Sequence, residues 1–321
     1  MATAIIYVFS GTKNTLVTAG MIKAHLESNQ IDTFIYEIKK PFESFPMPGS
    51  YDYVGFGYPV HAFNCPQMFL QFVKRLPQQA GKKAFIFKTS GEPFKLNDVS
   101  SYKLYRLLAK KNYEIVLEHH MLMPYNIMFR YQDSLAKQMY LYSNALCHQL
   151  VLKLLSGEKQ LFKFHLRHRI ISTIFRVQWS GAKLNGRLYT VNHKRCNLCM
   201  RCVYSCPSNN ISLKKGKLKF DFSCAMCMRC AMFCPTNAVN IGILRFWKVN
   251  GAYNFNKILS NPDIAADFIN PKTKGYFRLF KKFFENADRS LAAYGIKIPQ
   301  KYSGKETHTV EHYNIKKSCL K

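Results

Sequence analysis

The chain has 321 residues, which suggests about two domains of roughly 150 residues each. Hydrophobic residues make up 48% of the chain, which is enough for packed cores and excludes a disordered protein. Lys and Arg number 47 against 18 Asp and Glu, a formal net charge of +29, and no run of about 18 apolar residues predicts a membrane-spanning helix.

Strand-like and helix-like segments alternate through residues 1–156. Runs rich in apolar, β-branched and aromatic residues predict strands at 3–9, 33–38, 51–58, 84–89 and 115–118. Helical spacing of apolar residues predicts helices after the first strand, from Pro66, and over 102–110 and 134–155. This alternation implies an α/β doubly wound parallel sheet with helices on both faces.

Residues 157–187 form a basic linker with one acid, Glu158. Two interpretations of Leu161–Val177 are open: a helix lying on a membrane surface, and a linker helix packed between domains. On a helical wheel the apolar residues spread widely and the basic residues fall on two sides. This spread favours the packed linker helix.

Residues 188–241 contain the clustered cysteines, and residues 242–321 form a basic, aromatic extension without a usable motif. One helix is predicted in the extension, over Tyr276–Tyr294. The residues spaced for one face of this helix are Phe277, Phe280, Phe284 and Leu291. From Thr307 the chain is polar, and we expect a loose tail.

Eight of the 11 cysteines lie between Cys196 and Cys234, while Cys65, Cys147 and Cys319 stand apart. The N-terminus lacks the basic and apolar regions of a signal peptide. An odd cysteine count, C-x-x-C clustering and no export signal favour metal ligation over disulfides. We therefore expect a cytoplasmic protein.

The excess of basic residues indicates three classes of partner without choosing among them. A strongly positive surface raises encounter rates with acidic proteins, nucleic acid or anionic membranes. A proteome rich in lysine explains the same composition, so the charge alone assigns no function.

The clustered cysteines form two runs of identical spacing. The first run, Cys196–Pro207, reads CNLCMRCVYSCP, and the second, Cys224–Pro235, reads CAMCMRCAMFCP. Each cysteine of the first run recurs 28 residues later in the second. Other residues repeat at this offset too, and the pairs are Met200 and Met228, Arg201 and Arg229, and Asn209 and Asn237. The region is therefore an internal duplication. We interpret both arginines as solvated surface charges rather than partner contacts.

The spacing C-x-x-C-x-x-C-x-x-x-C-P predicts two four-iron (4Fe-4S) clusters. Three cysteines of a run wrap one corner of a cubane, and the fourth, followed by proline, reaches the other cluster. The predicted ligands of cluster 1 are Cys196, Cys199, Cys202 and Cys234, and those of cluster 2 are Cys224, Cys227, Cys230 and Cys206. Zinc is the alternative, but a zinc ribbon needs four cysteines and not two runs of four.

Residues 188–241 therefore resemble a bacterial two-cluster ferredoxin, a small α+β domain. Met200 and Met228 stand where that family usually has glycine. A methionine at this place would shield sulfur from water and shift the cluster potential.

Residues Ser10, Gly11, Thr12, Lys13, Asn14 and Thr15 form the first strand-to-helix turn, where backbone N–H groups and hydroxyls make an anion site. The Walker and Rossmann fingerprints are absent from the sequence. The turn resembles the flavodoxin phosphate loop, T-x-T-G-N-T, which implies that FMN binds here. Lys13 replaces a glycine of that pattern, at a position that prefers a positive φ.

Two further loops leave the carboxyl ends of predicted strands, where an open α/β sheet binds its ligand. Their candidate residues are Tyr58, Pro59, Val60, His61, Phe63, Ser90, Gly91 and Phe94. The resemblance to flavodoxin implies that these loops flank the isoalloxazine and that the three aromatic rings stack on it. The alternative is that the rings only pack within the protein and that His61 is a surface residue. No catalytic constellation stands out.

The domain order resembles a family of flavodoxin–ferredoxin fusion proteins of anaerobic microbes, over about residues 1–241. The resemblance implies an oxidoreductase-type electron-transfer flavoprotein that passes electrons between two 4Fe-4S clusters and FMN, fed by an acidic redox protein such as a ferredoxin. Two alternatives stay open: a flavin-dependent reductase of a small molecule, and an iron–sulfur regulatory protein that binds nucleic acid, although no helix-turn-helix or RNA-binding signature is visible. Peripheral membrane contact is a further open point.

Overall fold

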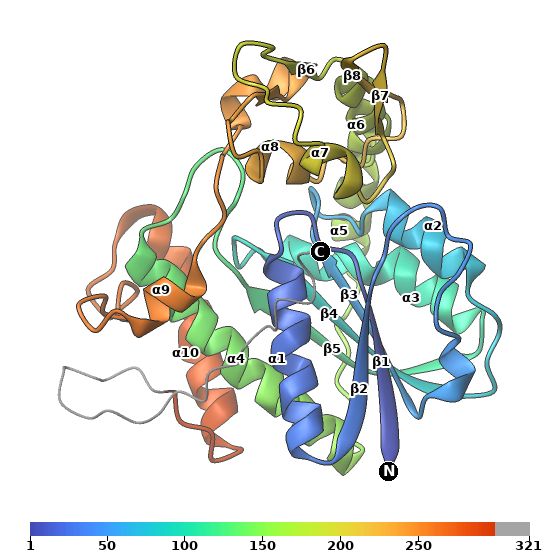
Figure 1. The fold of residues 1–321 in the computed structure, drawn as a ribbon. Coiled ribbons are helices and arrows are strands. Elements are labelled where there is room, and N and C mark those ends of the chain that lie inside the picture. Colours follow the sequence, from blue (N-terminus) through green and yellow to red (C-terminus); the bar gives the residue numbers. More distant parts are fainter. Residues whose placement is uncertain (299–321) are drawn as a thin grey trace.

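The computed structural model describes residues 1–298, and the polar tail predicted from Thr307 lies outside the described residues. The N-terminal part is a five-stranded parallel sheet in the order β2-β1-β3-β4-β5 (Figure 1). Its strands are β1 (Ala2–Val8), β2 (Ile31–Glu37), β3 (Tyr53–Pro59), β4 (Lys82–Ser90) and β5 (Tyr113–Leu122). This is the flavodoxin-like order, and its ligand crevice lies at the switch point between β1 and β3.

Helices cover both faces of the sheet, which confirms the predicted fold class of this part. Helices α1 (Asn14–Ser28) and α4 (Asp133–Ser156) pack on one face, and α2 (Gln67–Arg75) and α3 (Tyr102–Ala109) pack on the other. Successive residues of β1 point to opposite faces, and both sets are buried because both faces are covered. This double burial explains the continuous apolar run at 3–9.

The C-terminal extension returns to the flavodoxin-like part. It contains η3 (Gly242–Trp247), α9 (Phe255–Ser260), η4 (Gly275–Phe277) and α10 (Arg278–Ala292). Helix α10 packs against α4 and buries Phe280, Phe284 and Leu291. The helix predicted over Tyr276–Tyr294 is therefore confirmed, with its first residues in a 3₁₀ turn.

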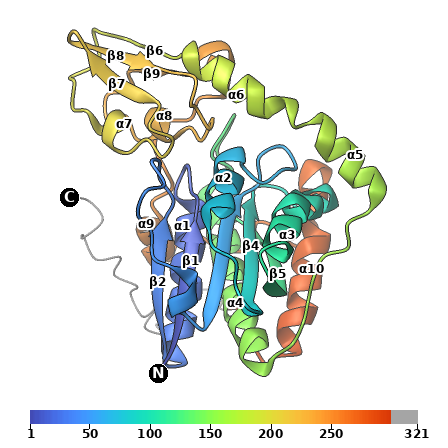
Figure 2. The same ribbon diagram turned by 90° about the vertical axis from the view of Figure 1, so that its right-hand side faces the viewer.

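The cysteine-rich region lies over the carboxyl ends of the sheet strands (Figures 1 and 2). It consists of β6 (Thr190–Val191), α7 (Arg201–Tyr204), β7 (Ile211–Lys214), β8 (Lys217–Phe220), α8 (Arg229–Met232) and β9 (Val239–Asn240). Strand β6 pairs with β9, and β7 pairs with β8, both antiparallel. The region is small, and its apolar centre includes Ile211, Phe220 and Ile241.

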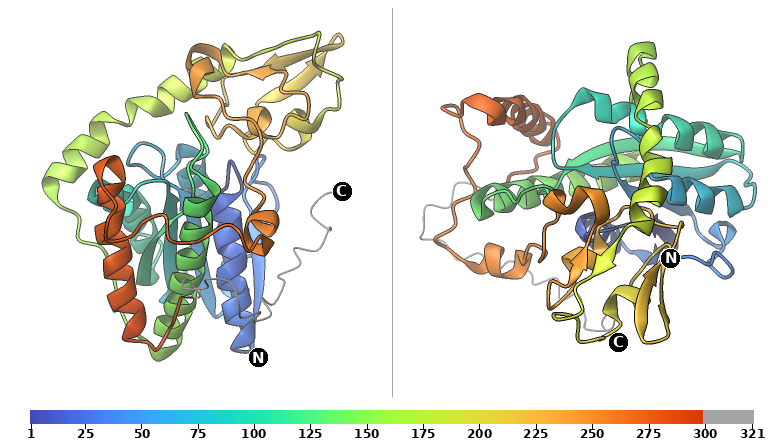
Figure 3. Two further views of the ribbon diagram at one scale, coloured as in Figure 1. Left: turned by 90° about the vertical axis from the view of Figure 1, so that its left-hand side faces the viewer. Right: turned by 90° about the horizontal axis from the view of Figure 1, so that it is seen from above.

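Helices α5 (Leu166–Ile174) and α6 (Val177–Arg187) form an arm that runs along the outside of the molecule to the cysteine-rich region (Figures 2 and 3). The expectation of a single helix over Leu161–Val177 is wrong in its bounds, whereas contacts at both ends of the arm agree with a linker packed against the two parts. The helix begins later and is interrupted, and one side of the arm is open to solvent. Within residues 1–298, no helix is both long and apolar enough to cross a membrane.

Candidate functional site

The loop Ser10–Thr15 lies at the switch point between β1 and β3, where it leads into α1. The Ser10 hydroxyl accepts a hydrogen bond from the Leu16 amide (3.3 Å), and the Thr15 hydroxyl meets that of Thr89 (2.7 Å). The described part of the chain offers no acceptor to the amide N–H groups from Gly11 to Thr15. Free amides at the start of a 15-residue helix make a site for an anion such as a phosphate.

Lys13 has a φ of 73° and a ψ of −9°, the left-handed conformation that glycine adopts most readily. The exposed side chain places its ammonium 5.4 Å from the centre of the Phe233 ring, in the second cysteine run. The lysine therefore keeps the backbone form expected of the flavodoxin glycine and adds a positive charge at the loop.

The second cysteine run packs directly on this loop. A Cβ atom at Gly11 would collide with the Cys227 carbonyl oxygen, so glycine is needed for the close approach. Arg229 is 5% exposed, and its guanidinium donates to the carbonyl oxygens of Gly11 (3.1 Å) and Ser10 and pairs with Glu37. The interpretation of Arg229 as a solvated surface charge is therefore wrong, whereas Arg201 is exposed as expected.

The loop after β3 places its side chains differently from the flavodoxin-based expectation. Tyr58 is fully buried in the core, where its hydroxyl meets that of Ser100 (3.0 Å), because it shares a strand face with Val54 and Phe56. Its ring does not line the strand-end surface, which corrects the predicted stacking role. Phe63 packs edge-on against Phe175 of the arm, with ring centres 5.1 Å apart.

His61, with Pro59 and Val60 beside it, lies under the arm and is partly exposed. Gln178 of α6 donates to the His61 carbonyl oxygen, and burial lowers the pKa of the imidazole to about 4. The imidazole is therefore neutral near pH 7, and the partly exposed His61 lines the cavity beside α6 rather than open surface. Val60 donates its amide to Thr89 (2.8 Å) and joins this loop to the end of β4.

The loop after β4 presents Ser90, Gly91 and Phe94 at the same edge of the sheet. Ser90 is bonded to His120 (2.7 Å), whereas Phe94 is 37% exposed and is the aromatic candidate left open to a ligand. A Cβ atom at Gly91 would collide with the Tyr125 ring, so Tyr125 covers this loop.

The loop after β5 also contributes, which the sequence reasoning missed. Asn126 is 6% exposed and donates to the Thr12 hydroxyl (2.8 Å), and its buried side-chain oxygen has no hydrogen-bond partner among the described residues. Asn14 donates to the Pro124 carbonyl oxygen (2.7 Å). The only sequence signal for these residues is their place after the fifth predicted strand.

The predicted ligands of cluster 2 line one cavity. These are Cys206, Cys224, Cys227 and Cys230, and the apolar residues Ile211 and Phe220 close the cavity. Burial, then the nearby thiols of Cys227, Cys224 and Cys206, hold the pKa of Cys230 well above its ordinary value. The cysteine that comes from the first run, Cys206, thus joins the three of the second.

The predicted ligands of cluster 1 also gather. Burial, then the thiols of Cys196 and Cys199 and, more weakly, that of Cys234, act on Cys202 and raise its pKa to about 11. Cys199 is exposed. Within residues 1–298, no three His, Cys, Asp or Glu side chains are arranged as ligands of a single metal ion.

The duplication extends to the backbone around both groups of cysteines. Met200 and Met228 have φ values of 58° and 61°, so both adopt the left-handed conformation that glycine favours. The amides of Asn210 and Ala238 donate to the sulfur atoms of Cys206 (3.3 Å) and Cys234 (3.2 Å). These amide dipoles point at the fourth cysteine of each run, which is grouped with the three cysteines of the other run.

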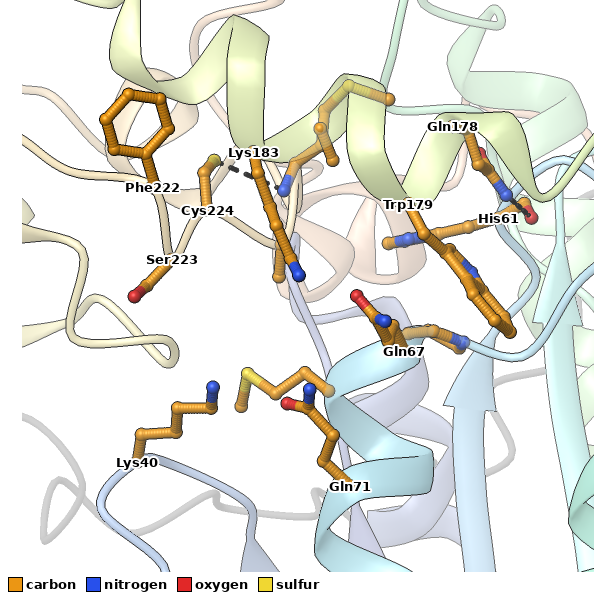
Figure 4. A pocket seen from close by; sticks show the side chains of 15 residues that line it. Lys40, His61, Gln67, Gln71, Gln178, Trp179, Lys183, Phe222, Ser223 and Cys224 are labelled. Carbon is orange, nitrogen blue, oxygen red and sulfur yellow. Dashed lines mark hydrogen bonds between the residues drawn. The ribbon is translucent and has the colours of Figure 1, made fainter.

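A cavity of about 140 Å³ lies beside the cluster 2 cysteines, between α2, α6 and the second cysteine run (Figure 4). Lys40 and Lys183 extend toward it from opposite sides. Burial, then the charge of Lys183, lowers the pKa of Lys40. The lining includes Gln67, Gln71 and Cys224 but no acidic residue. The cavity is therefore electropositive.

Comparison with known proteins gives no family model and no curated protein that matches the sequence. Solved structures resemble the N-terminal half. Flavodoxin 1 from Bacillus cereus is 16% identical over 48% of this chain and 98% of its own, with a TM-score of 0.35. A flavodoxin from the domain Archaea is 14% identical over 47% of this chain and 98% of its own, with a TM-score of 0.33. The apo form of an NADH:FMN oxidoreductase is 17% identical over 38% of this chain and 76% of its own, with a TM-score of 0.32. At these scores the likeness supports no argument, and the fold assignment rests on the strand order.

Proposed function

We propose that this protein is an electron-transfer flavoprotein that holds FMN at the sheet edge and two 4Fe-4S clusters in the cysteine-rich region. The observation that carries the proposal is the contact between the two sites. Cys227, one of the four cluster 2 thiols, and nearby Arg229 touch the loop whose free amides suit a phosphate. Sites that exchange electrons need such closeness, and covalent fusion maintains it.

Three sets of residues would hold the FMN and the two clusters. The amides of Gly11–Thr15 and the Thr12 hydroxyl would bind the FMN phosphate, with Phe94 and Tyr125 beside the ring. The two groups of four cysteines would ligate the iron. When bound, the clusters supply single-electron transfer, and the flavin accepts one or two electrons.

The grouping of the cysteines supports clusters over zinc. Cys206 of the first run lines one cavity with Cys224, Cys227 and Cys230 of the second run. Three cysteines from one run and the fourth from the other is the ligand pattern of a protein with two 4Fe-4S clusters. A zinc ribbon needs four cysteines and not two such runs.

The two groups of cysteines differ in their surroundings, which gives each a separate task. Cys199 of cluster 1 is exposed, and cluster 2 adjoins the phosphate loop through Cys227. The first group would therefore meet an external redox protein, and the second would face the flavin. A net charge of +29 favours an acidic donor such as a ferredoxin.

The cofactor content tests this proposal. Anaerobically purified protein should contain about eight irons, eight acid-labile sulfides and one FMN per chain. Thr12→Asp should abolish FMN retention and leave iron unchanged, because its carboxylate would repel the phosphate. Thr173→Asp, at an exposed threonine of α5, is the matched control and should retain FMN. Two zincs without sulfide would contradict the clusters, and normal FMN content in Thr12→Asp would contradict the site.

The electropositive cavity favours a second candidate function, reduction of a small anion. It borders Cys224, and two lysines face it without an acid in its lining. An oxidised anion bound there would lie next to the proposed cluster 2. The cavity of about 140 Å³ limits the substrate to a small oxyanion or carboxylate.

Reoxidation of the reduced protein tests the second function. A panel of inorganic oxyanions and small carboxylates should contain a compound that reoxidises the protein, followed by absorbance. The double variant Lys40→Gln/Lys183→Gln should need about tenfold more of that compound. Lys274→Gln, at an exposed lysine of the extension, should behave as the wild type. If the double variant responds like this control, the cavity is not the substrate site.

A further inference from the structure

One side of the arm formed by α5 and α6 is apolar and open to solvent. Its side chains are Leu166 (66% exposed), Ile170 (55%), Ile174 (67%), Val177 (74%), Leu184 (61%) and Leu188 (51%). Leu166, Ile170 and Ile174 are four residues apart in α5, and Val177 and Leu184 are seven apart in α6. Each set therefore lies on one side of its helix, and Leu188 directly follows α6. We call these six residues the outer stripe.

The opposite side of the arm is fixed to the protein by specific contacts. The Asn64 side chain donates to the Ser172 carbonyl oxygen (2.9 Å), and Arg169 lies 4.2 Å from the centre of the Tyr102 ring. Asn185 donates to the Ile241 carbonyl oxygen (3.1 Å) in the cysteine-rich region. Because these contacts hold the inner side at both ends, the folded chain presents the outer stripe to solvent.

The apolar surface continues beyond the arm. Ile243 and Phe246 of η3 are each 70% exposed. The Ile243 amide donates to the Asn185 side chain (2.9 Å), which places η3 beside α6. Contiguous exposed apolar surface of this kind marks an interaction site rather than ordinary surface.

Positive charge accompanies the outer stripe. The chain has no acidic residue between Glu158 and Asp221. Exposed basic residues stand next to the stripe in sequence, among them Lys163, Arg167 and Arg187. Apolar side chains with basic neighbours along a helical segment are the pattern of a segment that lies in the interface of an anionic membrane.

We propose that the outer stripe docks this protein onto an anionic lipid bilayer, with the arm lying parallel to the membrane plane. A second copy of the chain is a poorer occupant, because each copy has a net charge of +29 and the basic neighbours would repel. Since the arm extends from the flavodoxin-like part to the cysteine-rich region, docking holds both parts near the lipid (Figure 2).

Vesicle binding by the complete, cofactor-loaded protein tests the proposal. Wild-type protein should sediment at low salt with vesicles of phosphatidylglycerol and phosphatidylcholine, and much less with phosphatidylcholine alone. Ile170→Glu/Ile174→Glu should bind the anionic vesicles at least about tenfold more weakly, because two carboxylates enter the interface. Removing a basic neighbour, as in Arg167→Gln, should weaken binding about fivefold.

The matched control is Leu213→Glu/Leu279→Glu, which makes the same charge change at leucines that are 45% and 51% exposed elsewhere. It should lose far less affinity than the stripe variant. Three results would overturn the proposal: no wild-type binding to anionic vesicles, equal binding by the stripe variant and the control, or a wild-type dimer in sedimentation velocity that the stripe variant abolishes without any vesicle binding.

Discussion

Arg229 and Arg201 occupy equivalent positions of the duplicated cysteine runs and have different tasks. Arg201 is exposed. The Arg229 side chain is 6% exposed, pairs with Glu37, and donates to two carbonyl oxygens of the proposed phosphate loop and to that of Ser205 (3.3 Å). The duplication thus produced one arginine for solvent and one for the joint between the two parts.

Arg229→Met should destabilise the folded protein by about 3 kcal/mol, because the change leaves Glu37 and two buried carbonyl oxygens without their donor. Arg201→Met is the matched control and should change the unfolding free energy by less than about 0.5 kcal/mol. Urea unfolding under anaerobic conditions measures both, with iron content checked first. Equal midpoints for the two variants would show that the Arg229 contacts do not stabilise the joint.

Single residues also show which features of the site could be predicted from the sequence and which could not. The left-handed conformation of Lys13 followed from the glycine it replaces in the flavodoxin pattern, because backbone geometry is retained when the loop is retained. The direction of the Tyr58 side chain depends on strand register. A shift of the register by one residue would turn the side chain from the core to the ligand side. The sequence alone could not fix that register at the end of β3.

Among the elements, α10 and the turn before it support the candidate flavin site from behind. The Tyr276 hydroxyl donates to Glu92 (3.3 Å), and the Tyr131 hydroxyl donates to the Gly91 carbonyl oxygen (3.2 Å). Phe280 of α10 packs edge-on against Tyr131, with ring centres 6.0 Å apart. The C-terminal extension therefore holds the loop after β4 in place.

Phe280→Ala should destabilise the protein by about 3–4 kcal/mol, because Phe280 is fully buried and its loss leaves a cavity against α4. It should also weaken FMN binding through the loop after β4. Leu279→Ala, at a residue 51% exposed on the same helix, is the control and should cost less than about 1 kcal/mol. Thermal unfolding and FMN titration check both effects, and a buried-site variant as stable as the control would contradict the packing described here.

The elements also differ in how well periodicity predicted them. The centres of β1, β3 and β4 are buried on both faces and appeared in the sequence as apolar runs, whereas the edge strand β2 leaves Asp32 and Phe34 exposed. The arm was misjudged because a single wheel over Leu161–Val177 joined the non-helical start of that segment to two helices with a break near Phe175. With the true boundaries, the six residues of the outer stripe lie on the solvent side of the arm.

At the scale of the whole molecule, the sheet provides a ligand edge and the cysteine-rich region covers it. The strand order puts the switch point between β1 and β3, and Ser10–Thr15 lies there beneath Cys227 and Arg229. The domain order and the two groups of cysteines were predictable from motif spacing. Their docking was not, because the contact residues lie far apart in the chain and share no pattern.

The central claim of this account is that electrons pass between the exposed group of cysteines and the flavin edge through the group that touches it. Stopped-flow reduction by a reduced ferredoxin, followed at flavin wavelengths, tests this claim most directly. The wild type should reduce quickly at low salt and more slowly at high salt, because screening weakens attraction to its basic surface. Cys199→Ala should be much slower at both, while Leu198→Ala, at the exposed neighbour, should match the wild type. Equal flavin reduction rates in Cys199→Ala and the wild type would contradict the claim.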